Sequence, residues 1–410
     1  MIVFEHADVL DTHAGQLLSG RFVTVRDGLI SEISDSPPDA AATAGARRVD
    51  ARGKVLMPGL IDCHVHVLAS MLNAGRLAKL PNVLTVLRAV PILQGMLMRG
   101  FTTVRDAAGA DWSLAEAVRT GLVEGPRIFP SGRALSQTGG HGDFRERSDV
   151  IEPCPCTPKI GAIGRVVDGV DAIRLAVREE IQMGAMQIKI MASGGVASPT
   201  DPIHALGYSE DEIRAAVEEA SNAGTYVLAH AYTPKSIARA VRCGVRTIEH
   251  GNLVDEEAAR VMADHGAIAV PTLITYEALA SEGAALGLPA ESVAKIETVR
   301  SAGLRSLEIF ARAGVRMALG TDLLGESHRL QSGEFALRAG VLGNAEAIRA
   351  ATVHAAHVLM QDGRLGVIAA GATADLLLVD GNPLQDISVL AGQGERLAMI
   401  VKDGKVVKDL

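Results

Sequence analysis

The feature that most constrains the fold of this chain is a repeated alternation of short apolar runs and helical patterns, beginning near residue 60. Each run is short, apolar and ends in polar residues, as strands of a parallel sheet do. We expect eight such strands, at residues 60–66, 101–107, 127–132, 187–194, 226–232, 247–251, 267–274 and 316–322. Eight strands that alternate with helices predict an α/β fold of the (β/α)8, or TIM, barrel type.

The segments between these runs carry the signals of helices. Residues 171–184, 209–224 and 234–244 have apolar residues at i, i+3 and i+4 spacing and end in glycine, which is where helices commonly stop. Ser209 and Glu212 have the spacing of a capping box, so we expect a helix to begin at this point.

The two ends of the chain have a different pattern. Residues 1–57 alternate apolar and polar side chains and are interrupted by Gly, Asp and Pro, and strand-like runs return at 374–381 and 397–407. We therefore expect residues 1–57 and 363–410 to form one small β-sandwich beside a barrel of residues 58–362.

The composition is that of a folded globular protein, since 48% of the 410 residues are hydrophobic and 21% are charged. The 48 Asp+Glu outnumber the 40 Lys+Arg, and the aromatic residues are only 7 Phe, 4 Tyr and 1 Trp. This balance argues against nucleic acid as a partner, which requires clustered basic residues. No apolar run reaches the roughly 18 residues of a membrane helix, so we expect no membrane partner.

The location is expected to be cytoplasmic. Glu5 and Asp8 interrupt the apolar start of the chain, which disfavours a secretory signal. Four cysteines in 410 residues are too few for a disulfide scaffold. Cys154 and Cys156 stand in a turn-rich PCPCTP segment and are expected to be inert thiols.

Polar residues with metal-binding chemistry stand at the ends of the expected strands, where the active site of a barrel lies. His64 and His66 are two residues apart, so they share one face of their strand and suit a common divalent metal. Such a pair alone is also common among ordinary strand-end residues. Further candidates end or lie within four other strands: Lys189, His230, His250 and Asp322.

Lys189 is unusual because it lies between isoleucines, where a buried charge is costly. A neutral amine can react with CO2 to form a carbamate, an anionic ligand with two oxygens. The alternative is a lysine that is ion-paired or extends its ammonium to solvent. Four imidazoles, one lysine and one carboxylate at five strand ends favour a metal site.

The segments PGLIDCHVH (58–66) and GRLGVIAAGATADLLLVDGNP (363–383) resemble those of the amidohydrolase superfamily. The resemblance implies two divalent ions, with zinc the expected metal and manganese or cobalt left open. It implies that one ion is bound by His64, His66 and Asp322 and the other by His230 and His250. Lys189, as N6-carboxylysine, would bridge the two ions together with a hydroxide, and Asp322 would act as general base and acid.

The sequence also distinguishes branches of this superfamily. Deaminases carry a glutamate shortly after the histidine of the fifth strand, whereas here Ala231, Tyr232, Thr233 and Pro234 follow His230. Deaminases and imidazolonepropionase-like members also lack the lysine. The pattern therefore resembles the binuclear branch that hydrolyses amides, ureas and esters.

Within that branch, AHAYTP (229–234) and TGGHGD (138–143) resemble a dipeptidase-like group. This group cleaves Xaa-Pro, Xaa-Arg or Xaa-Lys dipeptides and N-acyl amino acids, and a fungal ochratoxin-hydrolysing amidase is related to it. The resemblance implies a small-molecule substrate, a homo-oligomer, and substrate contacts from Tyr232 and His141, whose hydrogen bonds would stabilise the oxyanion.

Alternatives remain open for the function and for single residues. The substrate can be another amide, a carbamate, an ester or a lactone, and a non-catalytic scaffold is the rival outside enzymes. Tyr232 can be a packing residue, and His141 a solvated loop residue. The remaining candidates are weaker: Asp106 as support for a ligand or a rim hydrogen bond, His328 and Arg329 as a solvated pair or a carboxylate clamp, and His354 and His357 as packing or surface residues.

Overall fold

The computed structural model describes residues 1–145, 159–196, 201–283, 285 and 290–410. Cys154 and Cys156, expected to be inert, lie outside these residues, whereas Cys63 and Cys243 are free and buried.

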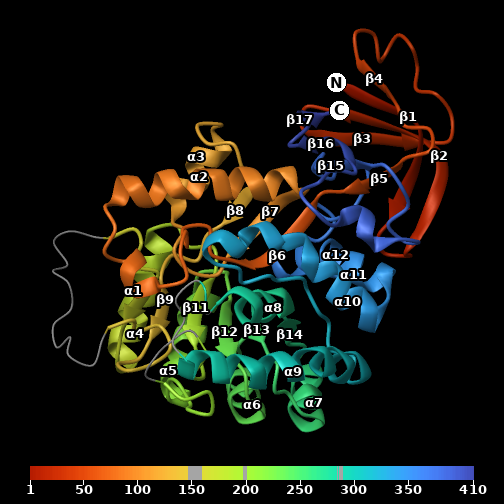
Figure 1. Cartoon of the computed structure of the whole chain (residues 1–410). Helices are drawn as coiled ribbons and strands as arrows, with labels where there is room; N and C mark the ends of the chain where they lie inside the picture. The colour runs from red at the N-terminus through yellow and green to blue at the C-terminus, as the bar shows by residue number, and fades with distance from the viewer. Residues whose placement is uncertain (146–158, 197–200, 284, 286–289) are drawn as a thin grey trace.

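Both ends of the chain contribute to one eight-stranded sheet (Figure 1). Its order is β17-β16-β15-β5-β1-β2-β3, and β4 pairs with β1. The strands are β1 (Ile2–Asp11), β2 (Gln16–Arg26), β3 (Leu29–Ser34), β4 (Arg47–Asp50), β5 (Val55–Pro58), β15 (Leu376–Val379), β16 (Leu397–Lys402) and β17 (Lys405–Asp409). A β-domain shared by the two ends is therefore present, as the sequence predicts.

Two hairpins of this β-domain are made by the same dipeptide. Asp27-Gly28 joins β2 to β3, and Asp403-Gly404 joins β16 to β17. All four residues have positive φ, between 50° and 82°, as a two-residue type I′ turn requires. A Cβ atom on Gly404 would lie 2.7 Å from Cα of Gly28, so the two turns also approach too closely for a side chain.

The middle of the chain forms two parallel sheets. One is three-stranded, in the order β6 (Leu60–Val65), β7 (Phe101–Asp106), β8 (Arg127–Phe129). The other is six-stranded, in the order β10 (Gly164–Val166), β9 (Ala134–Ser136), β11 (Ile188–Met191), β12 (Val227–Ala231), β13 (Thr247–His250), β14 (Ile268–Val270). Seven of the eight expected strands are thus confirmed, and β9 and β10 were not expected.

The expected eighth strand, 316–322, is an extended segment rather than a regular strand. Met317 forms a single parallel bridge with Ala269 of β14, and the carbonyl of Leu319 accepts from the backbone N–H of Cys63 in β6 at 2.8 Å. The N–H of Ala318 donates to Ala269 of β14, but the N–H of Leu319 donates to Ala350 instead of to β6, so no regular ladder with β6 forms. The segment nevertheless connects the two parallel sheets.

The strand expected at 267–274 is shorter than predicted. It ends at Val270, and α8 begins at Leu273. Pro271 lies between the two and has no N–H to donate to a neighbouring strand, which accounts for the early end.

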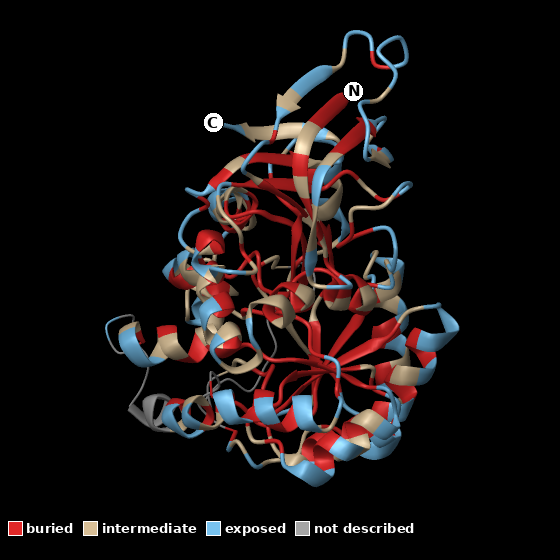
Figure 2. Ribbon diagram, turned by 90° about the vertical axis from the view of Figure 1, so that its right-hand side faces the viewer, coloured by how far each residue is buried: buried red, intermediate tan, exposed pale blue. Residues whose placement is uncertain are grey.

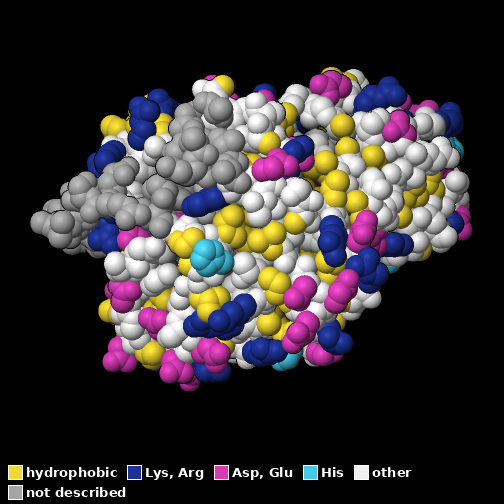
Figure 3. All heavy atoms as spheres, turned by 60° about the horizontal axis from the view of Figure 1, so that its bottom comes forward, with side chains coloured by type: hydrophobic (Ala, Val, Ile, Leu, Met, Phe, Trp, Pro, Cys, Tyr) yellow, Lys and Arg dark blue, Asp and Glu magenta, His cyan; other side chains and the backbone are white. Residues whose placement is uncertain are grey.

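Helices cover the outer faces of the parallel strands, which lie buried in the centre of Figure 2. On the face viewed in Figure 3, basic and acidic side chains are interspersed. Ser209 and Glu212 form the predicted capping box of α5. No helix among the described residues is long and apolar enough to cross a membrane. The helices are α1 (Ala74–Leu77), α2 (Asn82–Met98), α3 (Trp112–Arg119), α4 (Val170–Gln182), α5 (Glu210–Asn222), α6 (Pro234–Arg242), α7 (Glu256–Asp264), α8 (Leu273–Glu282), α9 (Ala290–Arg312), α10 (Glu334–Leu342), α11 (Asn344–Ala350) and α12 (Val353–Val358), with 3-10 helices η1 (Gly325–Gly333) and η2 (Ile387–Leu390).

The β-domain and the parallel part share one hydrophobic core. Leu377 of β15 and Leu397 of β16 belong to the same buried cluster as Leu93 and Met96 of α2. A Cβ atom on Gly100, between α2 and β7, would lie 3.0 Å from Cδ1 of Leu377, so this contact is tight. The two parts are therefore expected to lose their packing together.

We predict that Leu377→Ala lowers the free energy of unfolding by about 2–5 kcal/mol, because it leaves a cavity in this shared core. Urea unfolding followed by far-UV circular dichroism measures the loss. Leu304→Ala is the matched control, because Leu304 is 46% exposed and its replacement should cost no more than about 0.5 kcal/mol. Equal losses in the two variants would contradict a shared core.

Candidate active site

Two histidines at the end of β6 face one carboxylate. Nε2 of His66 lies 3.1 Å from Oδ1 of Asp322, and Nε2 of His64 lies 3.6 Å from the same oxygen. The prediction that these two imidazoles point to the same side of the strand is therefore confirmed. Asp322 reaches them from the segment that hydrogen-bonds to β6, since its N–H donates to the carbonyl of His64 at 2.8 Å.

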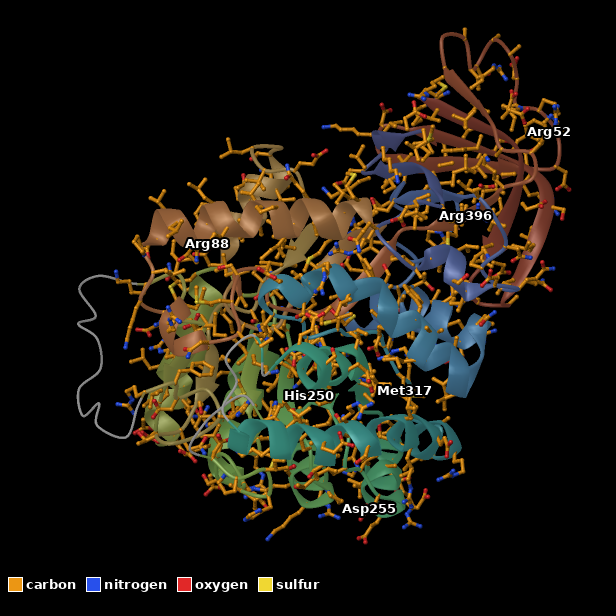
Figure 4. The ribbon with its side chains drawn as sticks, viewed as in Figure 1. Arg52, Arg88, His250, Asp255, Met317 and Arg396 are labelled. Carbon is orange, nitrogen blue, oxygen red and sulfur yellow. The ribbon has the colours of Figure 1, made fainter. Side chains whose placement is uncertain are left out.

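His250, at the end of β13, completes a compact group with His64 and Asp322. One ligand atom from each of the three residues lies within 4.8 Å of the others. Figure 4 labels His250 inside the ribbon, close to the ends of the parallel strands. His250 and Asp322 have positive φ, 71° and 52°, a backbone conformation that costs about 1–3 kcal/mol and is commonly retained at functional sites.

His230, at the end of β12, extends the group on its other side. Its ring centroid lies 4.7 Å from that of His250 and 4.4 Å from that of His141, whose ring is stacked on it at 22°. Nε2 of His230 donates to the carbonyl of Gly194 at 3.1 Å. His141 is only 8% exposed, and its Nδ1 lies 3.2 Å from Oδ2 of Asp201, so His141 is not a solvated loop residue.

Lys189 of β11 is 2% exposed, so the alternative in which its ammonium reaches solvent is wrong. Burial lowers its pKa to about 8, although the carboxylates of Glu249 and Asp322 act in the opposite direction. The lowered pKa increases the share of the neutral amine near neutral pH, and this is the form that reacts with CO2.

The protonation of three of the four imidazoles suits a cation, whereas the hydrogen bond to Asp322 raises the pKa of His66 against the effect of burial. Burial lowers the pKa of His64, His230 and His250 well below the usual value, and the neutral imidazole is the form that binds a metal. Nε2 of His64 is buried without a hydrogen-bond partner among the described residues. Burial alone would raise the pKa of Asp322, but His64 and His66 hold it below its usual value. The donor set therefore fits a divalent metal.

Tyr232 follows His230 and contacts both the cluster and a second tyrosine. Its ring centroid lies 4.8 Å from that of His230 and 5.4 Å from that of His250. Its hydroxyl lies 2.7 Å from the hydroxyl of Tyr276 in α8, and both side chains are buried. Sequence reasoning missed Tyr276; its only sequence signal is that it closely follows the seventh strand.

A small cavity of about 90 Å³ opens beside His141. It is lined by Ser193 and Gly194 after β11, by Asp201, and by Gln137 after β9. The cavity therefore adjoins the cluster on the side of His230.

Two aspartates hold the backbone around the cluster. The carboxylate of Asp106 accepts from the N–H groups of Val67 and Ala110 at 2.8 and 3.0 Å, which are the rim hydrogen bonds expected as one of its two roles. Asp62, which sequence reasoning missed, accepts from the N–H groups of His64 and Thr321 at 3.1 and 3.2 Å. It therefore links the two segments that carry the ligands.

Of the weaker candidates, Arg329 lies on the surface, where it pairs with Glu282 at 2.5 Å. His328 is buried instead of solvated, and its Nε2 donates to the carbonyl of Ala69 at 3.2 Å. His354 donates to the carbonyl of Met317 at 3.1 Å, and His357 pairs with Asp362, as packing or surface residues do.

A cluster of imidazoles and a carboxylate at the carboxyl ends of parallel strands is typical of metal-dependent hydrolases. A model of the amidohydrolase family matches residues 55–407, so the chain belongs to the amidohydrolase family. It is a hydrolase that acts on amide bonds.

Three similar proteins are informative. Ochratoxinase of Aspergillus niger is 32% identical over 422 aligned positions, which cover 98% of this chain and 86% of that protein. A solved prolidase in complex with N-methylphosphonate-L-proline is 61% identical over all of both chains, with a TM-score of 0.97. A Xaa-Pro dipeptidase with methionine bound in its active site is 29% identical over 99% of both chains, with a TM-score of 0.88.

We predict that Tyr232→Phe and Tyr276→Phe each cost about 1 kcal/mol of unfolding free energy, because each removes one side of the same hydroxyl pair. The double variant should cost about as much as either single one, since the hydrogen bond is lost only once. Urea unfolding of the full chain measures all three. Strictly additive losses would mean that the two hydroxyls do not share a hydrogen bond.

Proposed function

We propose that this amidohydrolase cleaves the amide bond of dipeptides or N-acyl amino acids in a metal-dependent reaction. The observation that carries the proposal is the cluster of His64, His230 and His250 beside Asp322. The buried Lys189 is near enough for its charge to lower the pKa of His64 and of His250. The 61% identical prolidase with a bound proline derivative supports this substrate class.

We propose further that the two parallel sheets and the segment 316–322 close into a (β/α)8 barrel of residues 58–362. The hydrogen bonds of that segment to β14 and β6 support closure on one side. On this proposal, residues 1–57 and 363–410 form a flanking β-sandwich.

In this proposal one ion is held by His64, His66 and Asp322 and a second by His230 and His250, with Lys189 as N6-carboxylysine between them. Zinc is the expected metal, because imidazole nitrogens and carboxylate-type oxygens suit it. When bound, such ions lower the pKa of a coordinated water and polarise the carbonyl of the substrate.

The protein's own groups supply the proton transfers. Asp322 is ionised at neutral pH, since its pKa lies below the usual value, and it is 21% exposed at the side chain. It accepts the proton of the attacking water and delivers it to the nitrogen of the leaving amine. Tyr232 and His141, whose rings both contact the ring of His230, donate hydrogen bonds to the oxyanion that forms on the carbonyl.

A second candidate function is hydrolysis of an ochratoxin-like amide, or of another amide, carbamate, ester or lactone. The similarity to Aspergillus niger ochratoxinase over 98% of this chain supports this second candidate. The homo-oligomeric state and the cytoplasmic location stay predictions of the sequence.

We expect the purified chain to contain about two divalent ions, and Lys189→Ala to lose most of both the metal and the hydrolysis, because a bridging ligand is removed. Metal analysis beside an assay on the same samples measures this. Lys405→Ala, a change of an exposed lysine in β17, is the control and should match the native chain. One ion in all three proteins with activity retained would contradict a bridged pair.

A substrate panel separates the two functions. We expect Ala-Pro and N-acetyl-proline to be hydrolysed, and Ala-Arg to show whether a basic residue is accepted after the scissile bond. Ochratoxin A and simple esters test the alternative, and chelator-treated protein is the blank. Turnover of the esters alone would remove the dipeptide proposal.

In the same assay Tyr232→Phe should lower kcat about 10²–10³-fold, as loss of an oxyanion donor does.

A further inference from the structure

We infer that Glu249 and Arg105 are positioning residues for His64: together they decide which ring nitrogen of His64 carries the proton. The inference rests on the proposed function, because it concerns the imidazole that is to bind a metal. It assigns a role to two charged residues that lie within the strands β13 and β7.

The first step is the contact between Glu249 and His64. Oε2 of Glu249 lies 2.6 Å from Nδ1 of His64, and the two side chains are 0% and 1% exposed. Both carboxylate oxygens of Glu249 accept hydrogen bonds from Arg105 and so act as acceptors, which leaves Nδ1 as the donor in this contact. Nε2 is then the unprotonated nitrogen, and it is the ring atom that lies buried without a hydrogen-bond partner in the described parts of the chain.

The second step is the set of contacts that fixes the position of Glu249. Arg105 donates to both carboxylate oxygens of Glu249, each at 2.8 Å. Its Nε donates to the carbonyl of Cys63 at 2.5 Å, directly before His64 in β6. Thr247 adds a hydrogen bond to Oε1 of Glu249 at 2.5 Å. The carboxylate therefore has a fixed orientation toward Nδ1 of His64.

The third step concerns the energetic balance of the pair. Arg105 and Glu249 are both 0% exposed, and removing two charges from water commonly costs as much as their attraction returns. An apolar pair of similar volume would serve packing equally well. A carboxylate that holds Nδ1, in contrast, fixes the ring orientation and increases the basicity of the ligating nitrogen.

His64 differs in this respect from two neighbouring candidates. Nδ1 of His66 donates to the carbonyl of Ala108 at 3.0 Å, and Nδ1 of His250 bonds to the hydroxyl of Thr272 at 2.8 Å. Both partners are neutral. Among these three rings, His64 alone has a carboxylate outside the proposed ligand set on its second nitrogen. Loss of Glu249 should therefore affect mainly the ion that His64 holds.

The variant Glu249→Gln tests this directly. Whichever way the glutamine amide turns, its NH2 group faces either the donors of Arg105 or Nδ1 of His64, so the acceptor pattern cannot be kept. The full chain is stripped of metal by chelation, supplied with bicarbonate, and titrated with Zn²⁺ against a chromophoric chelator. We expect Glu249→Gln to bind one of its zinc ions, the one that His64 would hold, about 10–100-fold more weakly than the native chain does.

Glu334→Gln is the matched control. Glu334 is also 0% exposed and is paired with an arginine, Arg338, at 2.8 Å, but its other hydrogen bond within the described residues is to the N–H of Ile274 and not to a proposed ligand. Its zinc affinity should equal that of the native chain. Zinc affinity of Glu249→Gln equal to that of this control would overturn the inference.

A second variant covers the case in which Glu249→Gln does not fold. Arg105→Met combined with Glu249→Met removes both charges and leaves an apolar pair, which such sites commonly tolerate. We expect this variant to fold and to show the same loss of zinc affinity. A folded double variant with native affinity would overturn the inference.

The native protein provides an independent readout. In the metal-free full chain labelled with ¹⁵N-histidine, we expect His64, identified by comparison with His64→Asn, to be the tautomer protonated at Nδ1. Protonation at Nε2 would overturn the inference. If the native chain binds no zinc at all, the proposed function fails. If it binds zinc and Glu249→Gln does not weaken the binding, only the positioning role fails.

Discussion

The geometry of the site depends on the lateral hydrogen bonds between β6 and the segment 316–322. The N–H of Asp322 donates to the carbonyl of His64, and the carboxylate of Asp62 accepts from the backbone of both segments. The bonds that cross between the two segments join residues more than 250 positions apart in the chain. Together with the bond between Cys63 and Leu319, they bring the carboxylate to the imidazoles, which are carried by a different segment of the chain.

The site is in turn connected to the β-domain by polar side chains. Gln331 donates to Oδ2 of Asp62 at 2.9 Å, and its own carbonyl oxygen accepts from Arg99 at 3.1 Å. Arg99 also donates to Gln393, which lies in the C-terminal part of the chain, at 3.0 Å. The β-domain therefore supports the site through a continuous row of hydrogen bonds as well as through the shared core.

Much of the fold and of the candidate cluster could be predicted from the sequence, because the signals are local. A short apolar run ending in His64-Val65-His66, or in His230, reveals both the strand and its functional end. Glu249, Arg105 and Tyr276 were missed, because each is explained only by a partner far away in the chain. The segment 316–322 was predicted as a full strand because its apolar pattern cannot show that Leu319 bonds to Ala350.

The pairing of β5 with β15 has a consequence for the order of folding. Val55 lies opposite Val379 in this pair, so β5 leaves the ribosome long before its neighbour in the sheet exists. Until β15 has been synthesised, one edge of β5 has no strand beside it, and open sheet edges readily pair with other chains. This edge therefore has to be kept from pairing with other chains while the parallel region is still being made.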